Sequence, residues 1–124
     1  MVVLDTCCLI ELCKPKPLLK RTTLDKIESA AAILSVSFAE IALKIKIRRL
    51  MMNLSAYDLY EAYRELAEIR IVEIGVQEWL DAIDLDWANK DPADRLIVAY
   101  AQKNKSSIVT SDKKIKSFYK DVLW

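Results

Sequence analysis

Short apolar runs alternate with longer amphipathic stretches along the chain, and this pattern predicts strands that are each followed by helices. Four runs contain the apolar and β-branched residues typical of buried strands, and a fifth at the end of the chain is consistent with an edge strand. The predicted strands are Met1–Leu4, Ile33–Val36, Arg70–Ile74, Ser107–Thr110 and Val122–Trp124. Strands separated by long helical crossovers favour an α/β domain built around a parallel sheet.

Polar capping residues mark the starts of most predicted helices. Asp5-Thr6 precedes a helix over Cys7–Cys13, and the S-x-x-E pattern of Ser37 to Glu40 predicts a capping box at the start of another. The remaining helices are predicted over Thr23–Ala32, Phe38–Arg49, Ser55–Ala67 and Val76–Asp86, from Asp91 onward, and from Ser111 onward.

Two of these helices have informative apolar patterns. The helix that begins at Asp91-Pro92 is apolar on all sides over Leu96–Ala101, so we expect it to lie between other elements. The helix from Val76 has a single apolar stripe that includes Trp79. Trp79 and Trp87 are candidates for stacking on bases. Trp79, however, lies on the apolar stripe, which favours a core position for it.

The composition limits the possible chemistry. The chain has 124 residues, of which 53% are hydrophobic and 30% charged, so we expect one globular domain over residues 1–124. It has no histidine, which excludes catalytic triads, imidazole bases and histidine-containing metal sites. Its only glycine is Gly75, which excludes glycine-rich phosphate loops. Carboxylate chemistry remains.

Charge and cysteine placement bear on partners and compartment. Acidic residues dominate the middle of the chain and basic residues both ends, which suggests an acidic surface flanked by basic ones, although solvated helix faces give the same pattern. Three cysteines, crowded near the start of the chain, cannot form a closed set of disulfides, which favours a reducing, cytoplasmic location. Free cysteines are usually small buried apolar residues, and we expect the same here. We expect no export signal and no membrane-spanning segment.

Four acids share one position in this pattern, at the carboxyl end of a predicted strand or in the first turn of the next helix. They are Asp5, Glu40, Asp94 and Asp112. The carboxyl ends of parallel strands meet along one edge of a sheet, so these acids are expected to converge. Clustered carboxylates repel one another unless a cation holds them, and oxygen ligands suit Mg²⁺ or Mn²⁺.

Each acid also has a purely structural explanation. Asp5 and Asp112 are suitable helix caps, and Asp94 suits the positive end of a helix dipole. Glu40 can close the capping box or pair with Lys44 one turn later.

Four segments resemble the PIN-domain ribonucleases, in particular the toxins of VapBC toxin-antitoxin pairs. The segments are Val3–Thr6, Ser37–Lys44 with Leu50, Asp91–Ala99 with Ala101, and Ile108–Asp112, and the resemblance extends over nearly the whole chain. The segment Asp91-Pro92-Ala93-Asp94-Arg95 is the most specific. Two positions depart from the family pattern, Ala39 where tryptophan is common and Arg48 where glycine is usual.

The resemblance implies a three-layer sandwich with about five parallel strands and metal-dependent cleavage of RNA. By position, the family's metal-binding acids correspond to Asp5, Glu40, Asp94 and Asp112. We expect Asp5 and Asp94 to be the central ligands, with the other two completing the set. Thr6 and Thr110 are candidates for orienting ligands or water from outside the first coordination sphere.

Further contacts remain open at this stage. Lys44 and Arg95 are candidates for phosphate contacts, and an ion pair with a neighbouring acid is the alternative for each. The resemblance also implies inhibition by an antitoxin and a homodimer. We place the dimer surface on Lys44–Leu50 and the helix over Ser55–Ala67.

Two other function classes use the same residues. A binding module of this fold would lack catalysis, but it would be expected to lose at least one acid, and none is missing. A metal-dependent phosphatase or DNA flap nuclease would use the same acidic chemistry, but 124 residues leave little room for the helices that select such substrates.

Overall fold

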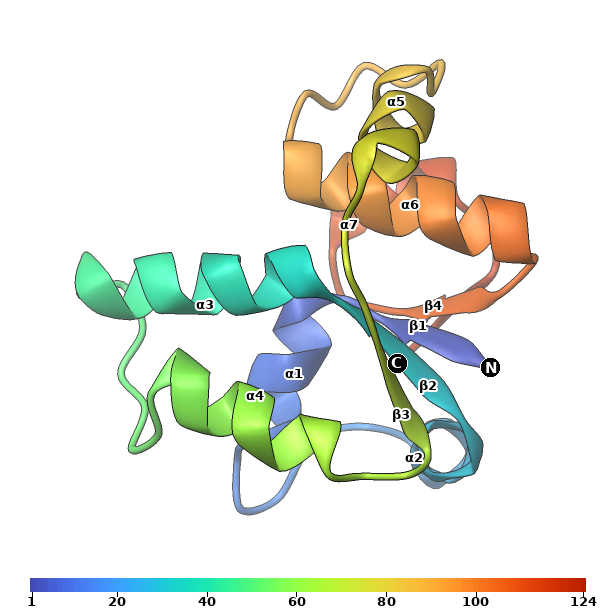
Figure 1. The fold of residues 1–124 in the computed structure, drawn as a ribbon. Coiled ribbons are helices and arrows are strands. Elements are labelled where there is room, and N and C mark those ends of the chain that lie inside the picture. Colours follow the sequence, from blue (N-terminus) through green and yellow to red (C-terminus); the bar gives the residue numbers. More distant parts are fainter.

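The computed structural model describes residues 1–124, and its strands form one sheet in which every pairing is parallel (Figure 1). The strands are β1 (Val2–Leu4), β2 (Ala31–Leu34), β3 (Ile69–Val72), β4 (Ser107–Val109) and β5 (Val122–Leu123). Their order across the sheet is β3-β2-β1-β4-β5. The predicted α/β class and five-stranded parallel sheet are confirmed.

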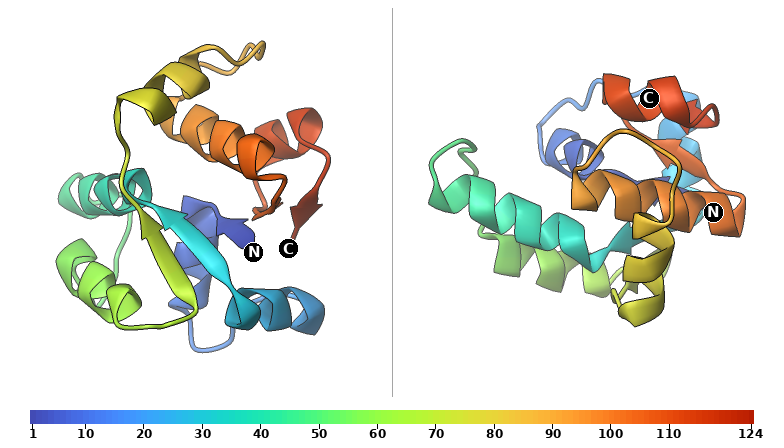
Figure 2. Two further views of the ribbon diagram at one scale, coloured as in Figure 1. Left: turned by 45° about the vertical axis from the view of Figure 1, so that its right-hand side comes forward. Right: turned by 90° about the horizontal axis from the view of Figure 1, so that it is seen from above.

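Seven helices cover the two faces of the sheet, as Figures 1 and 2 show. Helices α5, α6 and α7 lie on one face, and α1, α2 and α4 lie on the other, with α3 extending from the carboxyl end of β2. Their bounds are α1 (Thr6–Leu12), α2 (Arg21–Ser29), α3 (Ser35–Lys46), α4 (Ala56–Arg64), α5 (Val76–Ile83), α6 (Pro92–Asn104) and α7 (Lys113–Phe118).

Each face of the sheet has its own hydrophobic core. Val3 of β1 belongs to the core beneath α6, whereas its neighbours Val2 and Leu4 belong to the core beneath α1 and α4. Side chains alternate between the two faces of a strand, so a strand covered on both faces must be apolar at every position. This requirement explains the uninterrupted apolar runs at β1 and β2.

Helix α6 confirms the prediction of a sandwiched helix. Its residues Leu96–Ala99 and Ala101 are all buried. Asp91 caps its start by accepting a hydrogen bond from the backbone N–H of Asp94, and Pro92 occupies the first turn, where no N–H is needed. Lys105 ends it in the left-handed conformation.

The predicted capping box at Ser37 is wrong. Strand β2 begins at Ala31, two residues earlier than predicted, because Ala31 and Ala32 pair with Val2 and Val3. The predicted helix over Thr23–Ala32 therefore ends at Ser29, and α3 begins directly after the strand, at Ser35. Ser37 consequently lies inside α3, where it is fully buried.

The prediction that Trp79 lies in the core is also wrong. The apolar stripe of α5 faces outward: Val76 is 75% exposed, Trp79 42% and Ile83 67%. Ala82 is instead the buried residue through which α5 packs against α6. An alanine at this contact allows the two helices to approach closely, and the larger side chains on the other face remain in solvent.

The sheet has a topological switch point between β1 and β4. The chain runs outward from β1 through β2 to β3, then crosses over the sheet through α5 and α6 and returns to β4. In open α/β sheets, such a reversal leaves a crevice at the carboxyl ends of the strands, where ligands bind.

No helix of the structure has the length and apolar character needed to cross a membrane.

Candidate catalytic site at the carboxyl edge of the sheet

Asp5 is the central acid of the switch point, since it follows β1 directly and is only 5% exposed. Its Oδ1 accepts a hydrogen bond of 2.8 Å from the backbone N–H of Thr6, which caps α1 as predicted. Its Oδ2 accepts a 2.7 Å bond from the Thr110 hydroxyl, at the end of β4. Thr110 in turn accepts a 2.9 Å bond from the backbone N–H of Asp112. These bonds join Asp5 and Asp112 across the switch point.

Glu40 is linked to the same centre through hydroxyl groups. The Thr6 hydroxyl donates to Glu40 Oε1 at 2.5 Å and lies 2.9 Å from Ser37 Oγ. The Thr6 hydroxyl is the donor toward both acceptors, so its one proton is shared between Glu40 and Ser37. Ser37, fully buried inside α3, therefore lies beside the bond that holds Glu40.

Asp94 and Asp112 lie at the starts of α6 and α7. Asp94 Oδ2 accepts a 2.9 Å bond from the side-chain amide of Asn89, in the loop that precedes α6. Asp112 Oδ1 accepts a 3.0 Å bond from the backbone N–H of Ile115 and so caps α7. Both carboxylates are partly exposed and accessible to a ligand.

These acids influence one another electrostatically. Burial raises the pKa of Asp5, and the neighbouring charge of Asp112 adds to this effect. Burial also raises the pKa of Glu40, and burial together with the charges of Asp91, Asp5 and Asp112 raises the pKa of Asp94 to about 6. None of the four predicted acids takes part in an ion pair of the structure. Their hydrogen-bond donors are all neutral.

The donor set fits a divalent cation by its chemistry. It consists of carboxylate oxygens whose charges lack a cationic partner, and Mg²⁺ and Mn²⁺ prefer such ligands. The acids do not form a closed coordination shell, because no three acidic or thiol side chains converge closely enough to enclose an ion. Each carboxylate is held instead by the hydrogen bonds described above.

Arg95 contacts neither phosphate nor an acid, and both alternatives considered for it are wrong. It is 8% exposed, and its guanidinium donates to backbone carbonyls of the α5–α6 connection. The acceptors are the carbonyls of Ala82, Ile83, Leu85, Trp87 and Asn89. Arginine satisfies many carbonyls at once because its donors form a rigid fork. Arg95 therefore fixes the loop that supplies Asn89 to Asp94.

The charge of Lys44 offsets part of the rise in the pKa of Glu40, but Lys44 forms no ion pair with this acid.

The cysteines differ from one another. Cys8 is buried, as expected for a small apolar residue, whereas Cys13 is exposed. Cys7 is half-buried, and its Sγ donates to Asp5 Oδ2 at 3.4 Å.

Sequence reasoning missed Ser37, Asn89 and Cys7 as neighbours of the acids. The spacing of Ser37 and Glu40 did single out this pair, but for a cap that α3 does not use. Asn89 had a weaker signal, a short polar side chain close before the Asp91 cap. Cys7 lies only two residues after Asp5, but its Sγ is also 3.5 Å from the Thr110 hydroxyl, and this second contact depends on the pairing of β1 with β4.

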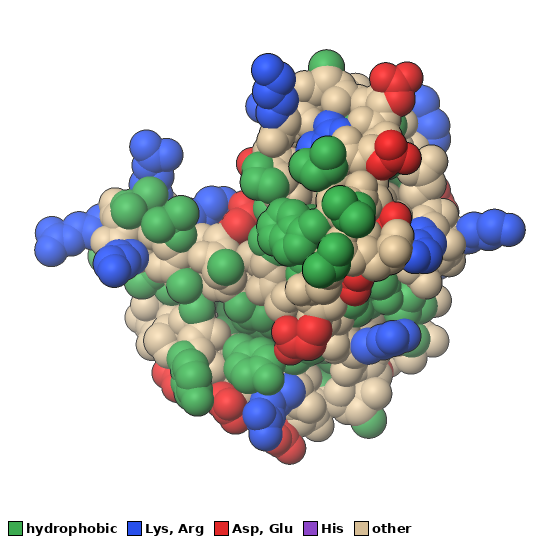
Figure 3. All heavy atoms as spheres, turned by 45° about the horizontal axis from the view of Figure 1, so that its top comes forward, with side chains coloured by type: hydrophobic (Ala, Val, Ile, Leu, Met, Phe, Trp, Pro, Cys, Tyr) green, Lys and Arg blue, Asp and Glu red, His purple; other side chains and the backbone are tan.

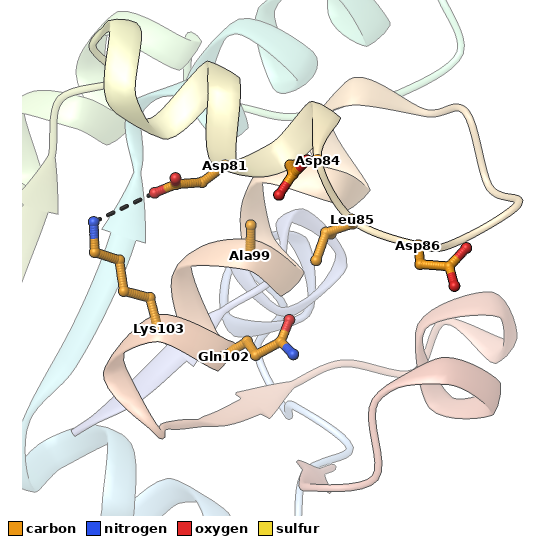
Figure 4. Close-up of a pocket in the computed structure, with 7 residues that line it drawn as sticks. All are labelled: Asp81, Asp84, Leu85, Asp86, Ala99, Gln102 and Lys103. Carbon is orange, nitrogen blue, oxygen red and sulfur yellow. Dashed lines mark hydrogen bonds and ion pairs between the residues drawn. The ribbon is translucent and has the colours of Figure 1, made fainter.

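The acidic edge is distinct from a hollow between α5 and α6, shown in Figure 4. This hollow has a volume of about 410 Å³ and is lined by Asp81, Asp84, Leu85, Asp86, Ala99, Gln102 and Lys103. Asp81 pairs with Lys103 there at 3.3 Å. None of the four predicted acids lines it.

The family model of the PIN domain matches residues 2–121. A comparison with curated proteins finds no match. Among solved structures, the chain is similar to a toxin-antitoxin complex from Klebsiella pneumoniae, with 18% identity and a TM-score of 0.67 over 100% of this chain and 97% of the other. FitAcB from Neisseria gonorrhoeae is 20% identical, with a TM-score of 0.66 and the same coverage.

A third similar structure is VapC20 of Mycobacterium tuberculosis, described as a toxin that cleaves the sarcin-ricin loop. It is 13% identical, with a TM-score of 0.71, over 94% of each chain. At such low identities the likeness between structures establishes a shared fold.

Proposed function

The chain belongs to the PIN domain family, and on this premise we propose that it is a divalent-metal-dependent endoribonuclease and the toxin of a toxin-antitoxin pair. The observation that carries the proposal is the set of carboxylates at the switch point, which are held by neutral donors and lack any cationic partner. The similarity to toxins, one of them described as cleaving RNA, supports this choice of substrate.

The metal is Mg²⁺ or Mn²⁺ in this proposal, since hard oxygen ligands suit both. Asp5 and Asp94 are its central ligands, and Glu40 and Asp112 complete the set directly or through water. When bound, such an ion activates water and neutralises the charge that builds on the phosphate during hydrolysis.

The protein's own groups keep these carboxylates in place. Thr110 and the backbone of Thr6 occupy both oxygens of Asp5, so this buried carboxylate has one orientation. The Thr6 hydroxyl fixes Glu40, and Asn89 fixes Asp94. Groups held in advance lose little conformational freedom when substrate and metal bind, which lowers the cost of reaching the transition state.

Cleavage of single-stranded or looped RNA tests the proposal directly. Purified protein is expected to cut such RNA in Mg²⁺ or Mn²⁺ and to stop when EDTA is added. Asp94→Asn is expected to abolish cleavage, because asparagine keeps the shape and one acceptor oxygen but removes the charge that holds the cation. Glu11→Gln, an acid distant from the switch point, is the matched control and is expected to remain active.

Cleavage that persists in Asp94→Asn or in excess EDTA would show that a contaminating nuclease is responsible. Folded protein that binds RNA without cutting it in either metal would favour the catalytically silent binding module instead.

An antitoxin is the expected protein partner, since the similar structures include toxin-antitoxin complexes. A carboxylate cluster is well matched by arginine, whose planar fork can bind carboxylates with two bonds. We therefore expect the inhibitor to present a basic side chain to the acids at the switch point. The expected cytoplasmic location remains a prediction.

A homodimer is expected from the family, and exposed apolar side chains offer two surfaces for it. Ile47 lies on the surface expected from the sequence, at Lys44–Leu50, and is 48% exposed, whereas Ile83 lies on the stripe of α5 and is 67% exposed. Figure 3 shows hydrophobic side chains gathered in a patch on this face of the molecule. Light scattering at tens of micromolar is expected to give a mass above the 14.2 kDa of one chain. Comparison of Ile47→Glu with Ile83→Glu identifies the surface, and a wild-type mass of 14.2 kDa would count against a dimer.

A further inference from the structure

A polar hollow lies next to the acidic edge, between the α5–α6 loop and α7. Its volume is about 400 Å³, and it is lined by Trp87, Ala88, Asn89, Lys90, Lys114 and Ser117. Trp87 stacks on Phe118 of α7, with ring centroids 4.8 Å apart and an interplanar angle of 17°. This contact joins the loop to the helix and gives the hollow a fixed wall.

The hollow adjoins two of the four acids. Asn89, which lines it, donates its side-chain amide to Asp94 Oδ2. Lys114 lies in the first turn of α7, the helix that Asp112 caps. A strand whose phosphate lies at the acids can therefore continue into this hollow.

The two lysines that line the hollow form no ion pairs within the protein. Lys90 and Lys114 are exposed, and neither forms an ion pair with an acid. Three further exposed lysines of the same segment, Lys113, Lys116 and Lys120, also lack an acidic partner. Ammonium groups without an acidic partner thus lie beside carboxylates without a cationic one, although Lys120 also donates to the Ser117 carbonyl.

An acidic edge repels the phosphates of RNA, so a nuclease needs positive charge beside it to hold the strand. Lysine ammonium groups bind phosphate as point charges, with little demand on direction. The hollow is open and its lining carries two lysines, an amide and a hydroxyl, unlike the enclosed, mainly apolar pockets that bind small molecules. We propose that Lys90 and Lys114 hold backbone phosphates of single-stranded RNA next to the cleavage site. This inference rests on the proposed ribonuclease function.

Binding without cleavage tests the inference separately from catalysis. Fluorescence anisotropy of a labelled single-stranded RNA oligonucleotide, in EDTA, gives the affinity as a function of salt concentration. In the double variant Lys90→Gln/Lys114→Gln, the slope of log K against log salt is expected to become shallower by about 1.4, or about 0.7 for each lost phosphate contact.

The opposite edge of the sheet supplies a matched control. A hollow of about 300 Å³ there is lined by Met1, Val2, Lys26, Ser29, Lys105 and Ser107, and so it also has two lysines. Lys26→Gln/Lys105→Gln removes the same charge at a distance from the acids and is expected to leave the slope unchanged. Thermal melts of both double variants check that they are folded.

Three results would overturn the inference: equal loss of slope in both double variants, no change in Lys90→Gln/Lys114→Gln, or no binding of RNA by the wild type in EDTA. The first would indicate an effect of net charge alone. Failure of the ribonuclease function is distinguishable, because it would appear as binding that depends on Lys90 and Lys114 but no cleavage in Mg²⁺ or Mn²⁺.

Discussion

Acids at the carboxyl edge of the sheet and acids elsewhere in the molecule have different partners. Glu11 accepts bonds from the backbone N–H of Leu18 and from Lys14, both at 2.9 Å, and these contacts lower its pKa. Asp81 accepts from Gln77 and pairs with Lys103, which lower its pKa. At the carboxyl edge, burial and neighbouring carboxylates raise the pKa values of Asp5, Glu40 and Asp94 instead.

The difference separates acids that contribute to stability from the acids that we propose as ligands of a cation. An acid with a lowered pKa is bound more favourably in its charged form when the chain is folded, so it stabilises the fold. Buried carboxylates with raised pKa values destabilise the fold when ionised. The protein keeps these charges at the switch point without a cation of its own, which is the arrangement expected of a site for an external cation.

The largest effect on stability is expected from substitution of Arg95, the buried cation that directly follows Asp94 in the chain. Arg95→Met removes a side-chain donor from five backbone carbonyls, of which those of Ala82 and Leu85 keep a backbone N–H donor and the other three do not. We expect the free energy of unfolding to fall by about 3 kcal/mol or more, since each unsatisfied buried group costs about 1–3 kcal/mol. Denaturant unfolding measures the loss. A change below about 1 kcal/mol would show that Arg95 is not a structural clamp.

Asp94→Asn is expected to act in the opposite direction in metal-free protein. It removes an uncompensated negative charge but retains an oxygen that accepts from Asn89. At pH 7 the melting temperature is expected to rise by about 4 °C, the shift for about 1 kcal/mol in a domain of this size. A fall in melting temperature would mean that Asp94 stabilises the fold as an ordinary helix acid.

The pH dependence follows from the same raised pKa. Asp94 has a pKa of about 6 in the folded chain, above its value of about 3.9 when unfolded, so the folded chain binds more protons between these values. The stability of metal-free wild type therefore decreases as the pH rises through about 6. Thermal melts are expected to show the advantage of Asp94→Asn at pH 7 shrinking below about pH 6 and disappearing near about pH 4, the unfolded pKa. A constant advantage would contradict the raised pKa.

The smallest effect on stability is expected at Asp81, an acid that is already paired with a lysine of the protein. Lys103→Met removes the partner of Asp81 on the surface. Exposed ion pairs contribute about 0–1 kcal/mol, and Gln77 still donates to Asp81, so we expect a loss below about 0.5 kcal/mol. Denaturant unfolding that gave more than about 1 kcal/mol would remove the distinction between ligand-binding acids and structural ones.

The succession of strands and helices along the chain, and the position of the four acids at strand-to-helix junctions, were predictable because they depend on local patterns. Apolar runs followed by caps identified each strand-to-helix junction, and Asp5, Asp91 and Asp112 act as the caps expected of them. The direction of the α5 stripe and the partners of Arg95 were not predictable. Both depend on how α5 packs on α6 through Ala82, a contact between elements that periodicity does not specify.

Ser37 is a second residue whose contacts depend on the packing of elements and not on local spacing. Its spacing from Glu40 is that of a capping box, and only the pairing of Ala31 with Val2 places it inside α3. The sequence therefore singled out Ser37 and Glu40 as a pair but assigned the wrong contact to it, since both residues meet at the Thr6 hydroxyl instead.

The central claim is that the unpaired carboxylates bind a divalent cation, and a thermal melt in millimolar Mn²⁺ tests it most directly. Binding to the folded state alone raises stability by mass action. The melting temperature of wild type and of Glu11→Gln is expected to rise with Mn²⁺, and that of Asp94→Asn to stay unchanged. No shift in the wild type, or an equal shift in Asp94→Asn, would contradict the claim.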